Sequence, residues 1–125
     1  MTAPGTPLVE ARQVDKTYDT RKGLFGRLIV RRDYLVHALN SVSFGIARGE
    51  TLGLIGESGC GKSTLARVVL RLQPPTAGQV FFEGEDITAA GAERMKALRR
   101  RMQIIFQDPY ASLNPLQTVE QIVGL

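Results

Sequence analysis

The sequence predicts an α/β fold, and three observations lead to that prediction. A short apolar run at residues 51–55 is typical of a strand buried on both faces of a parallel sheet. A glycine-rich loop follows this run, and residues 63–72 then carry apolar side chains at helical spacing. Further β-rich stretches at residues 8–18, 34–44 and 79–83 are candidate strands. Strands interleaved with helices in this way indicate an α/β domain.

The composition fits one small globular domain and excludes several classes of protein. The chain has 125 residues, of which 43% are hydrophobic and 22% charged, and its net charge is +4. No segment approaches the roughly 18 consecutive apolar residues of a membrane span. Residues 1–7 lack the basic-then-apolar pattern of a secretory signal. The single cysteine, Cys60, cannot form an internal disulfide. Together these features exclude a membrane-embedded, a collagen-like and a disulfide-stapled protein.

The first part of the chain predicts two strands separated by a basic insertion. Residues 1–7 contain two prolines and form a loose start, and residues 8–18 show the partial period-two alternation of a strand. Residues 19–36 are interpreted as an insertion, because glycines interrupt them and their charges suit a solvated surface. A second strand is expected within residues 34–44.

The middle of the chain predicts a helix, a strand and a second helix. The first helix covers residues 63–72, and the prolines at positions 74 and 75 stop it. A strand is expected at residues 79–83, with a turn at Gly84. Residues 91–101 favour a helix and carry an excess of four positive charges, as do residues 20–36.

The last part of the chain predicts a strand, a loop and the start of a helix. Residues 102–106 are a further candidate for a buried strand, and two prolines constrain the loop that follows. Thr118 is a candidate N-cap with Gln121 three residues later, which is the pattern of a capping box.

Residues 56–63, Gly-Glu-Ser-Gly-Cys-Gly-Lys-Ser, match the phosphate-loop motif G-x-x-x-x-G-K-[ST] in full. The glycines let backbone N–H groups approach a phosphate closely, and the following helix directs its positive dipole end at the same group. Lys62 adds a full charge for the β- and γ-phosphates, and the hydroxyl of Ser63 suits Mg²⁺. Thr64 can hydrogen-bond near the α-phosphate. The motif therefore predicts a site for nucleotide phosphates.

Two reactive side chains receive a structural interpretation. Cys60 is interpreted as a small residue whose side chain points away from the phosphates. A reactive thiol is the alternative, because a helix N-terminus lowers the pKa of a thiol. His37 has no motif that links it to Cys60, and we expect it on the surface of a strand.

The loop and its flanks resemble those of ABC transporter ATP-binding subunits. Residues 56–64 look like the phosphate loop of these subunits, and residues 41–50 and 102–109 agree with its surroundings. More narrowly, residues 106–115, Phe-Gln-Asp-Pro-Tyr-Ala-Ser-Leu-Asn-Pro, are similar to the subunits that drive oligopeptide and dipeptide importers. The resemblance covers residues 8–125. It implies a P-loop NTPase fold of the ABC ATPase type, with a mostly parallel core sheet and an antiparallel edge subdomain.

The resemblance implies a site for ATP and Mg²⁺. Tyr18 matches the aromatic residue that stacks on adenine, and the alternative is a strand-end tyrosine that packs locally. Gln107 matches the glutamine that reaches Mg²⁺ and the attacking water. Lys62 and Gln107 are the expected catalytic residues, and Ser63 and Gln107 the expected metal ligands. The full set of expected nucleotide contacts is Tyr18, Gly56, Glu57, Ser58, Gly59, Cys60, Gly61, Lys62, Ser63, Thr64 and Gln107.

The resemblance also implies motifs that these 125 residues do not contain. They are a Leu-Ser-Gly-Gly-Gln-type signature, the Walker B aspartate for Mg²⁺ with its adjacent general-base glutamate, and a histidine switch. We therefore expect residues 8–125 to be the N-terminal part of an ABC-type ATP-binding domain, truncated before these motifs. We also expect the fragment alone to be inactive as an ATPase, because hydrolysis needs a positioned water.

The resemblance implies partners and a location as well. The expected partners are transmembrane permease subunits, a second ATP-binding subunit in a homo- or hetero-dimer and, indirectly, a substrate-binding protein. The expected location is peripheral, at the cytoplasmic face of the inner membrane. We expect no nucleic acid, because both basic segments are interpreted mainly as solvated surfaces. The alternatives are a soluble ABC ATPase without a transporter and a truncated, non-catalytic interaction module.

Overall fold

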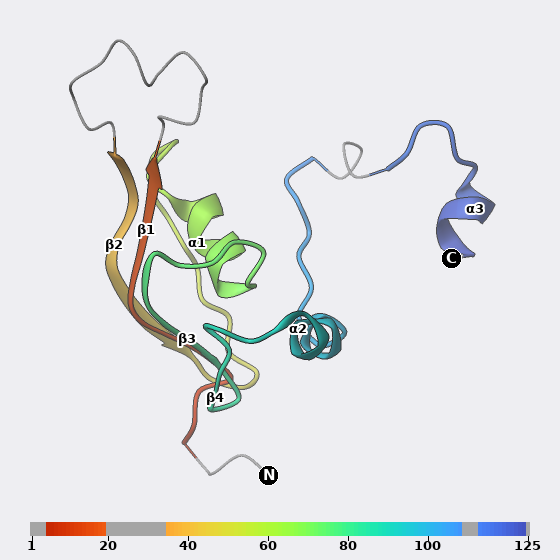
Figure 1. Ribbon diagram of the computed structural model, residues 1–125. Helices are drawn as coiled ribbons and strands as arrows, with labels where there is room; N and C mark the ends of the chain where they lie inside the picture. Colours follow the sequence, from red (N-terminus) through yellow and green to blue (C-terminus); the bar gives the residue numbers. More distant parts are fainter. Residues whose placement is uncertain (1–4, 20–34, 109–112, 125) are drawn as a thin grey trace.

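Four strands form one antiparallel sheet with the order β2-β1-β3-β4 (Figure 1). The computed structural model describes residues 5–19, 35–108 and 113–124. The strands are β1 (Val9–Asp19), β2 (Leu35–Ile46), β3 (Ala77–Phe82) and β4 (Glu85–Asp86). The helices are α1 (Lys62–Val69), α2 (Ala92–Arg99) and α3 (Val119–Val123). The predicted mixture of helices and strands is therefore confirmed, and so are the strands expected at residues 8–18, 34–44 and 79–83.

A β-bulge in β1 explains why its sequence alternates only in part. The register against β2 and β3 shifts after Ala11 and Arg12, and Gln13 has a φ of 48°. The extra residue lets Ala11 and Val14 both point into the core, although they are three positions apart. Gly78 of β3 lies against this bulge: a Cβ atom there would be 2.2 Å from the backbone oxygen of Gln13.

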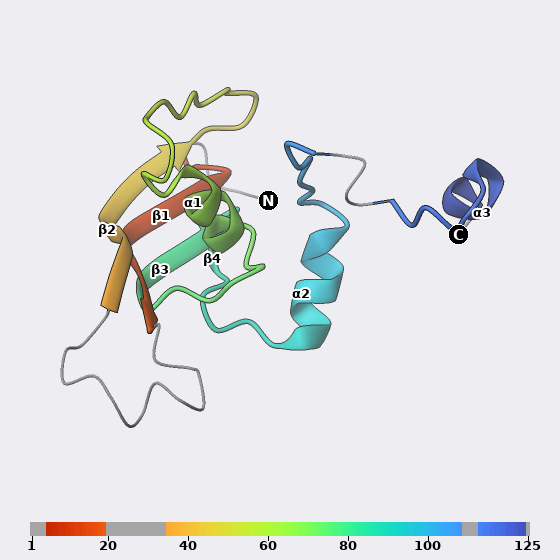
Figure 2. The same cartoon turned by 90° about the horizontal axis from the view of Figure 1, so that it is seen from above.

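The core lies between the sheet and two helices. In two views at right angles, α1 and α2 lie on the same side of the sheet, and α3 lies apart from it (Figures 1 and 2). Both helices bury apolar side chains at a spacing of three residues, whereas α3 has no buried residue. The buried core consists of Ala11, Val14, Leu39, Leu65, Val68, Val80, Phe82, Ile87, Met95 and Leu98.

The helix ends follow from local hydrogen bonding. The first helix ends at Val69 rather than at residue 72, because Arg71 adopts a left-handed φ of 53° and its Nε donates to the carbonyl of Ile87 at 2.9 Å. The helix therefore stops before the prolines could stop it. At α3 the predicted capping box is confirmed: the Thr118 hydroxyl accepts from the Gln121 amide, and the Gln121 side chain accepts from the Thr118 amide.

Two predicted strands are wrong. Residues 51–55 and 102–106 are irregular, and Ile55 and Ile105 are 97% and 92% exposed. A buried parallel strand needs a hydrogen-bonded neighbour on each side, and the described residues supply no such neighbour for either segment. Within the described ranges the sheet is therefore antiparallel, which matches the expected edge subdomain and not the expected parallel core.

Asp19, Leu35 and Val36 belong to strands, and the rest of the predicted insertion lies outside the described residues. Among the helices that the structure describes, none has the length and apolar character needed to cross a membrane.

Ion pairs connect the β3–β4 turn to its surroundings. Glu85 accepts two hydrogen bonds from Arg94 of α2, and Glu83 accepts from Arg101 and Arg48. The Arg94 guanidinium lowers the pKa of Glu85, and Arg101 followed by Arg48 lowers that of Glu83. The predicted solvated basic helix is therefore partly neutralised by this turn.

These pKa shifts predict a loss of stability in acid. Both folded pKa values lie below the ordinary value of 4.5, so the stabilisation is complete above that pH and disappears as the pH falls through the folded values. The urea midpoint, measured from about pH 7 to about pH 3, should therefore decrease at the acidic end. An Arg94→Gln variant should show a smaller decrease, because its Glu85 has nearly the same pKa in both states. A midpoint independent of pH would contradict this prediction.

Candidate functional site

The glycine-rich loop leads directly into α1. Gly61 is the N-cap of the helix, with a φ of 97°, and its carbonyl accepts from the Leu65 amide at 2.8 Å. Gly59 also has a left-handed φ, of 81°. L-residues with a side chain rarely adopt this conformation, so both positions favour glycine. The loop therefore lies at the positive end of the helix dipole, as an anion site requires.

The loop is seated against strand β2. A Cβ atom at Gly61 would lie 2.4 Å from the backbone oxygen of Ala38 and 3.3 Å from the side chain of Leu39. Leu39 is itself buried in the core. The second glycine of the motif is thus required by packing against the sheet as well as by its φ.

The ammonium of Lys62 lies within the loop that precedes it. Its Nζ donates to the carbonyl oxygens of Gly56 and Glu57 at 2.6 and 2.5 Å. The Sγ of Cys60 lies 3.4 Å from the same nitrogen. The lysine therefore places its positive charge at the centre of the loop and donates to neutral carbonyl groups.

The sequence predicts a Cys60 side chain that points away from the phosphates, and the structure places it toward Lys62. Its Sγ faces the Lys62 ammonium and lies against Gly56, where a Cβ atom would be only 2.6 Å from the sulfur. The side chain can turn inward because Gly56 has no side chain. The thiol is exposed, and Glu57, Ser58 and Gly59 beside it are exposed too.

A cavity of about 720 Å³ brings the predicted catalytic residues together. Lys62, Ser63, Ala66 and Arg67 of α1 line one side, and residues 104–108 line the other. Gln107 thus shares a cavity with Lys62 and Ser63. Residues 51–55, β3 and α2 do not line this cavity. Thr64 does not line it either and is half-buried on the next position of the helix.

The oxygen donors of this cavity suit a hard cation. The described residues contain no group of three or more His, Cys, Asp or Glu side chains that could hold a metal ion by themselves. The Ser63 hydroxyl and the Gln107 amide oxygen are the kind of ligand that Mg²⁺ accepts when phosphate oxygens and water complete its coordination. The residues present therefore fit a cation that arrives with a nucleotide.

Tyr18 lies at the end of β1 and packs locally. Its hydroxyl donates to Gln73 Oε1 at 2.5 Å, and the Lys16 ammonium lies 5.2 Å from the ring centroid. Tyr18 pairs with Val36 of β2, two residues from the Ala38 carbonyl that contacts Gly61. Two residues of strand span about 7 Å, so the tyrosine lies near the loop, but it does not line the cavity.

Sequence reasoning missed Arg67, Ile104 and Phe106 as cavity residues. Arg67 follows Ser63 by four positions, and this helical spacing is a signal that could have placed both on one face. Residues 104–106 carry no comparable signal, because their apolar run predicts a buried strand. His37 is exposed on β2, as expected, and its Nδ1 lies 3.3 Å from the Thr17 hydroxyl.

Comparison with known sequences gives one family and a consistent group of relatives. The family described as ABC transporter matches residues 39–122. The oligopeptide transport ATP-binding protein of Bacillus subtilis is 46% identical over 93% of this chain and 34% of its own length. The dipeptide transport ATP-binding protein of Escherichia coli is 43% identical over 94% of this chain and 34% of its own length. The chain thus spans about a third of the length of these curated relatives.

Comparison with solved structures confirms the predicted fold class. A bacterial ABC transporter cassette, solved as a dimer, matches with a TM-score of 0.70 and 28% identity, over 92% of this chain and 44% of its own. The same cassette in a dimeric post-hydrolysis state bound to ADP and Pi matches with a TM-score of 0.60 and 27% identity, over 74% and 35%. The described sheet and α1 are thus similar to part of a P-loop ATPase cassette.

Substitution of individual glycines by alanine should reveal the packing of the loop. Gly61→Ala should lower the unfolding free energy most, because it combines a left-handed φ with a collision against Ala38. Gly59→Ala should cost about 1–2 kcal/mol, because it meets only the backbone strain. Gly53→Ala has open space around its Cβ and should change stability by less than about 0.5 kcal/mol. Urea unfolding of the three variants measures this order, and equal costs at positions 61 and 53 would refute it.

Proposed function

The chain belongs to the ABC transporter family, and on that premise we propose that it forms the phosphate-binding part of an ATP-binding subunit that powers import of oligopeptides or dipeptides. The names of the relatives support the substrate class, since those from B. subtilis and E. coli are oligopeptide and dipeptide transport proteins. The observation that carries the proposal is the cavity that joins Lys62 and Ser63 to Gln107.

Lys62 is the proposed contact for the β- and γ-phosphates. Its ammonium donates to two loop carbonyls, and these bonds exchange for bonds to phosphate oxygens when the nucleotide binds. The exchange is favourable because an anionic oxygen is a stronger acceptor for a cation than a neutral carbonyl. The amides of residues 56–64 and the N-terminus of α1 complete the anion site.

Ser63 and Gln107 are the proposed protein ligands of Mg²⁺. The bound cation neutralises charge that develops on the phosphates during hydrolysis. Gln107 lies on a segment outside the phosphate loop. In our proposal the position of this segment therefore depends on whether a magnesium nucleotide is bound. Tyr18 is the proposed adenine contact, and its hydrogen bond to Gln73 holds the ring at the strand end beside the loop.

Hydrolysis of ATP needs groups in addition to Lys62, Ser63 and Gln107. In our proposal a second ATP-binding subunit supplies the other side of the nucleotide site, because ABC proteins bind ATP between the phosphate loop of one subunit and the signature motif of another. The dimeric cassette to which this chain is similar supports this arrangement. In our proposal these residues alone bind nucleotide weakly and turn it over negligibly, because the general-base glutamate that activates the water is not among them.

The proposed partners are transmembrane permease subunits and, through them, a substrate-binding protein. The proposed location is the cytoplasmic face of the cell membrane, where ATP is available and the permease is accessible. The support comes from the relatives, whose names describe transport and peptide import.

Mg-ATP should stabilise the chain, and Lys62 should be required for this effect. A ligand at about a hundred times its Kd raises the unfolding free energy by about 2.7 kcal/mol, which a thermal shift detects. Lys62→Ala should abolish the shift. Lys96→Ala is the matched control, because it removes the same charge from an exposed position of α2 and should keep the shift. Equal shifts in wild type and Lys62→Ala, or none in wild type, would refute nucleotide binding through the loop.

Isolation from membranes should test the transport assignment. An affinity-tagged chain, produced in its own cells and extracted with a mild detergent, should recover the permease subunits of a peptide importer. Mass spectrometry identifies the recovered proteins, and the untagged strain gives the background. Recovery with DNA or with soluble proteins alone would instead support a soluble ABC ATPase that serves no transporter.

A further inference from the structure

One carboxylate, that of Glu83, contacts the two segments that lead to the cavity. The Arg101 guanidinium donates to Glu83 Oε1 at 2.6 Å, and the Arg48 guanidinium donates to the same oxygen. Arg48 comes shortly before the residues that lead to the phosphate loop, and Arg101 comes directly before the segment that ends at Gln107. One side chain therefore contacts both the turn that precedes residues 51–61 and the residue that precedes the cavity-lining segment 104–108.

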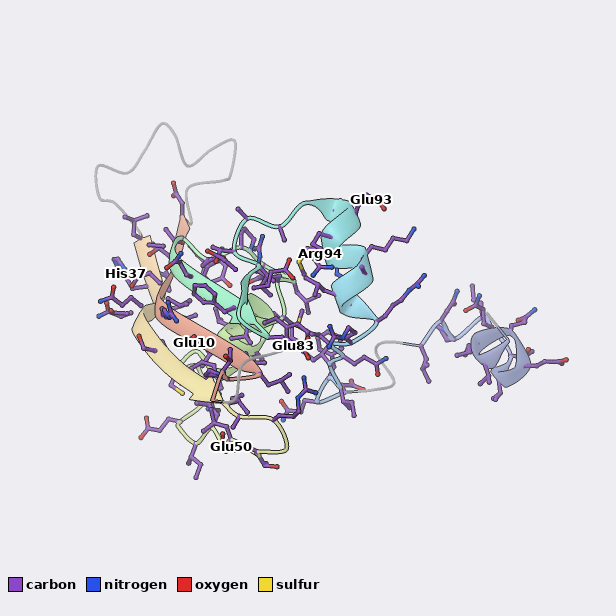
Figure 3. All side chains as sticks on the ribbon, turned by 90° about the horizontal axis from the view of Figure 1, so that it is seen from below. Glu10, His37, Glu50, Glu83, Glu93 and Arg94 are labelled. Carbon is purple, nitrogen blue, oxygen red and sulfur yellow. The ribbon has the colours of Figure 1, made fainter. Side chains whose placement is uncertain are left out.

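The surroundings of Glu83 make it a fixed anchor. Its side chain is 18% exposed, whereas the Arg48 and Arg101 side chains are 68% and 52% exposed. The Arg101 guanidinium also lies over the Phe82 ring, 5.2 Å from its centroid, and Phe82 belongs to the buried core. Figure 3 shows Glu83 on the side of the sheet that faces α2. The more exposed arginines thus contact a less exposed carboxylate, which directly follows the buried Phe82 in the chain.

The backbone conformation of Glu83 indicates independently that the turn is not the reason for a glutamate at this position. Glu83 and Gly84 form the two-residue loop between β3 and β4, and their φ values are 52° and 81°. Two positive φ values in such a loop are typical of a type I′ turn, for which Asn, Asp or Gly is preferred at the first position. A glutamate there carries conformational strain of about 1 kcal/mol, so the turn itself gives no reason for this residue type.

We propose that Glu83 is a positioning residue of the nucleotide site, which keeps Gln107 opposite Lys62 and Ser63 by holding Arg101 and Arg48 together. This inference rests on the proposed function, because it takes Gln107 to be a ligand of Mg²⁺. The two arginines lower the pKa of Glu83, so the carboxylate is ionised at neutral pH and the contacts persist there.

The neighbouring pair between Glu85 and Arg94 provides a matched control. It joins the same β3–β4 hairpin to α2, through an ion pair of the same arginine–glutamate chemistry. Arg94 lies in the first turn of α2, however, and does not adjoin the segment that carries Gln107. Glu85→Gln therefore removes an equivalent ion pair without releasing the base of the cavity.

The first experiment measures the affinity for ATP with Mg²⁺ and with EDTA. Glu83→Gln should reduce the gain in affinity that Mg²⁺ provides by about threefold, the size expected for the loss of partly exposed ion pairs, and leave the affinity in EDTA unchanged. Glu85→Gln should change neither the gain in affinity from Mg²⁺ nor the affinity in EDTA. A general loss of structure would lower the affinity both with Mg²⁺ and with EDTA, which distinguishes it from a loss of positioning. Equal magnesium gains in the two variants would overturn the proposal.

The second experiment does not depend on nucleotide. The chain has no tryptophan, so Ile105→Trp introduces a unique fluorophore at an exposed position that lines the cavity. Its anisotropy should fall when Glu83→Gln is added and stay unchanged when Glu85→Gln is added. If wild type binds no ATP, the proposed function fails, and the anisotropy still decides whether Glu83 holds the segment. Equal anisotropy in both double variants would refute that role.

A third variant separates positioning from folding. Glu83→Asn favours the left-handed turn but is too short to reach both arginines. It should keep or raise the melting temperature while lowering the Ile105→Trp anisotropy. If anisotropy falls only in variants that also melt at lower temperature, Glu83 stabilises the fold and does not position the segment.

Discussion

The close contact between Gly61 and the backbone of β2 is the constraint on which the rest of the site depends. Without a side chain at this position, the loop reaches the Ala38 carbonyl and α1 begins against the sheet. Leu65 and Val68 can then enter the core, which fixes the axis of the helix. The direction of the helix dipole, the inward turn of Lys62 and the cavity beside Ser63 all follow from that placement.

The polar contacts of the site are few, and they join segments that have no regular structure. Residues 51–61 and 102–108 contain neither helix nor strand, so no ladder of backbone hydrogen bonds defines their positions. Lys62 closes the first segment through two carbonyls, and Glu83 contacts the bases of both through arginines. In such segments one charged contact has a large effect on geometry, because it does not compete with a hydrogen-bonded ladder.

Most local structure could be predicted from the sequence. The strands β1, β2 and β3, the start of α1 and the capping box at Thr118 depend on nearby residues, and the patterns of those residues are strong. The bulge at Gln13 and the early end of α1 at Arg71 could not be predicted, because tertiary contacts with Gly78 and Ile87 select those left-handed conformations. The two apolar runs at residues 51–55 and 102–106 are not strands, because an apolar run forms a buried strand only when neighbouring strands are present.

The sequence by itself determined the phosphate loop and its chemistry, since the motif at residues 56–63 specifies backbone freedom, one cation and one hydroxyl at consecutive positions. It also indicated Gln107 through resemblance. Only the tertiary structure decided that Gln107 shares a cavity with Lys62 and Ser63, that Cys60 turns inward and that Glu83 contacts both arginines. The physical reason is that these relations join residues distant in the chain, and distances across a fold depend on packing rather than on local pattern.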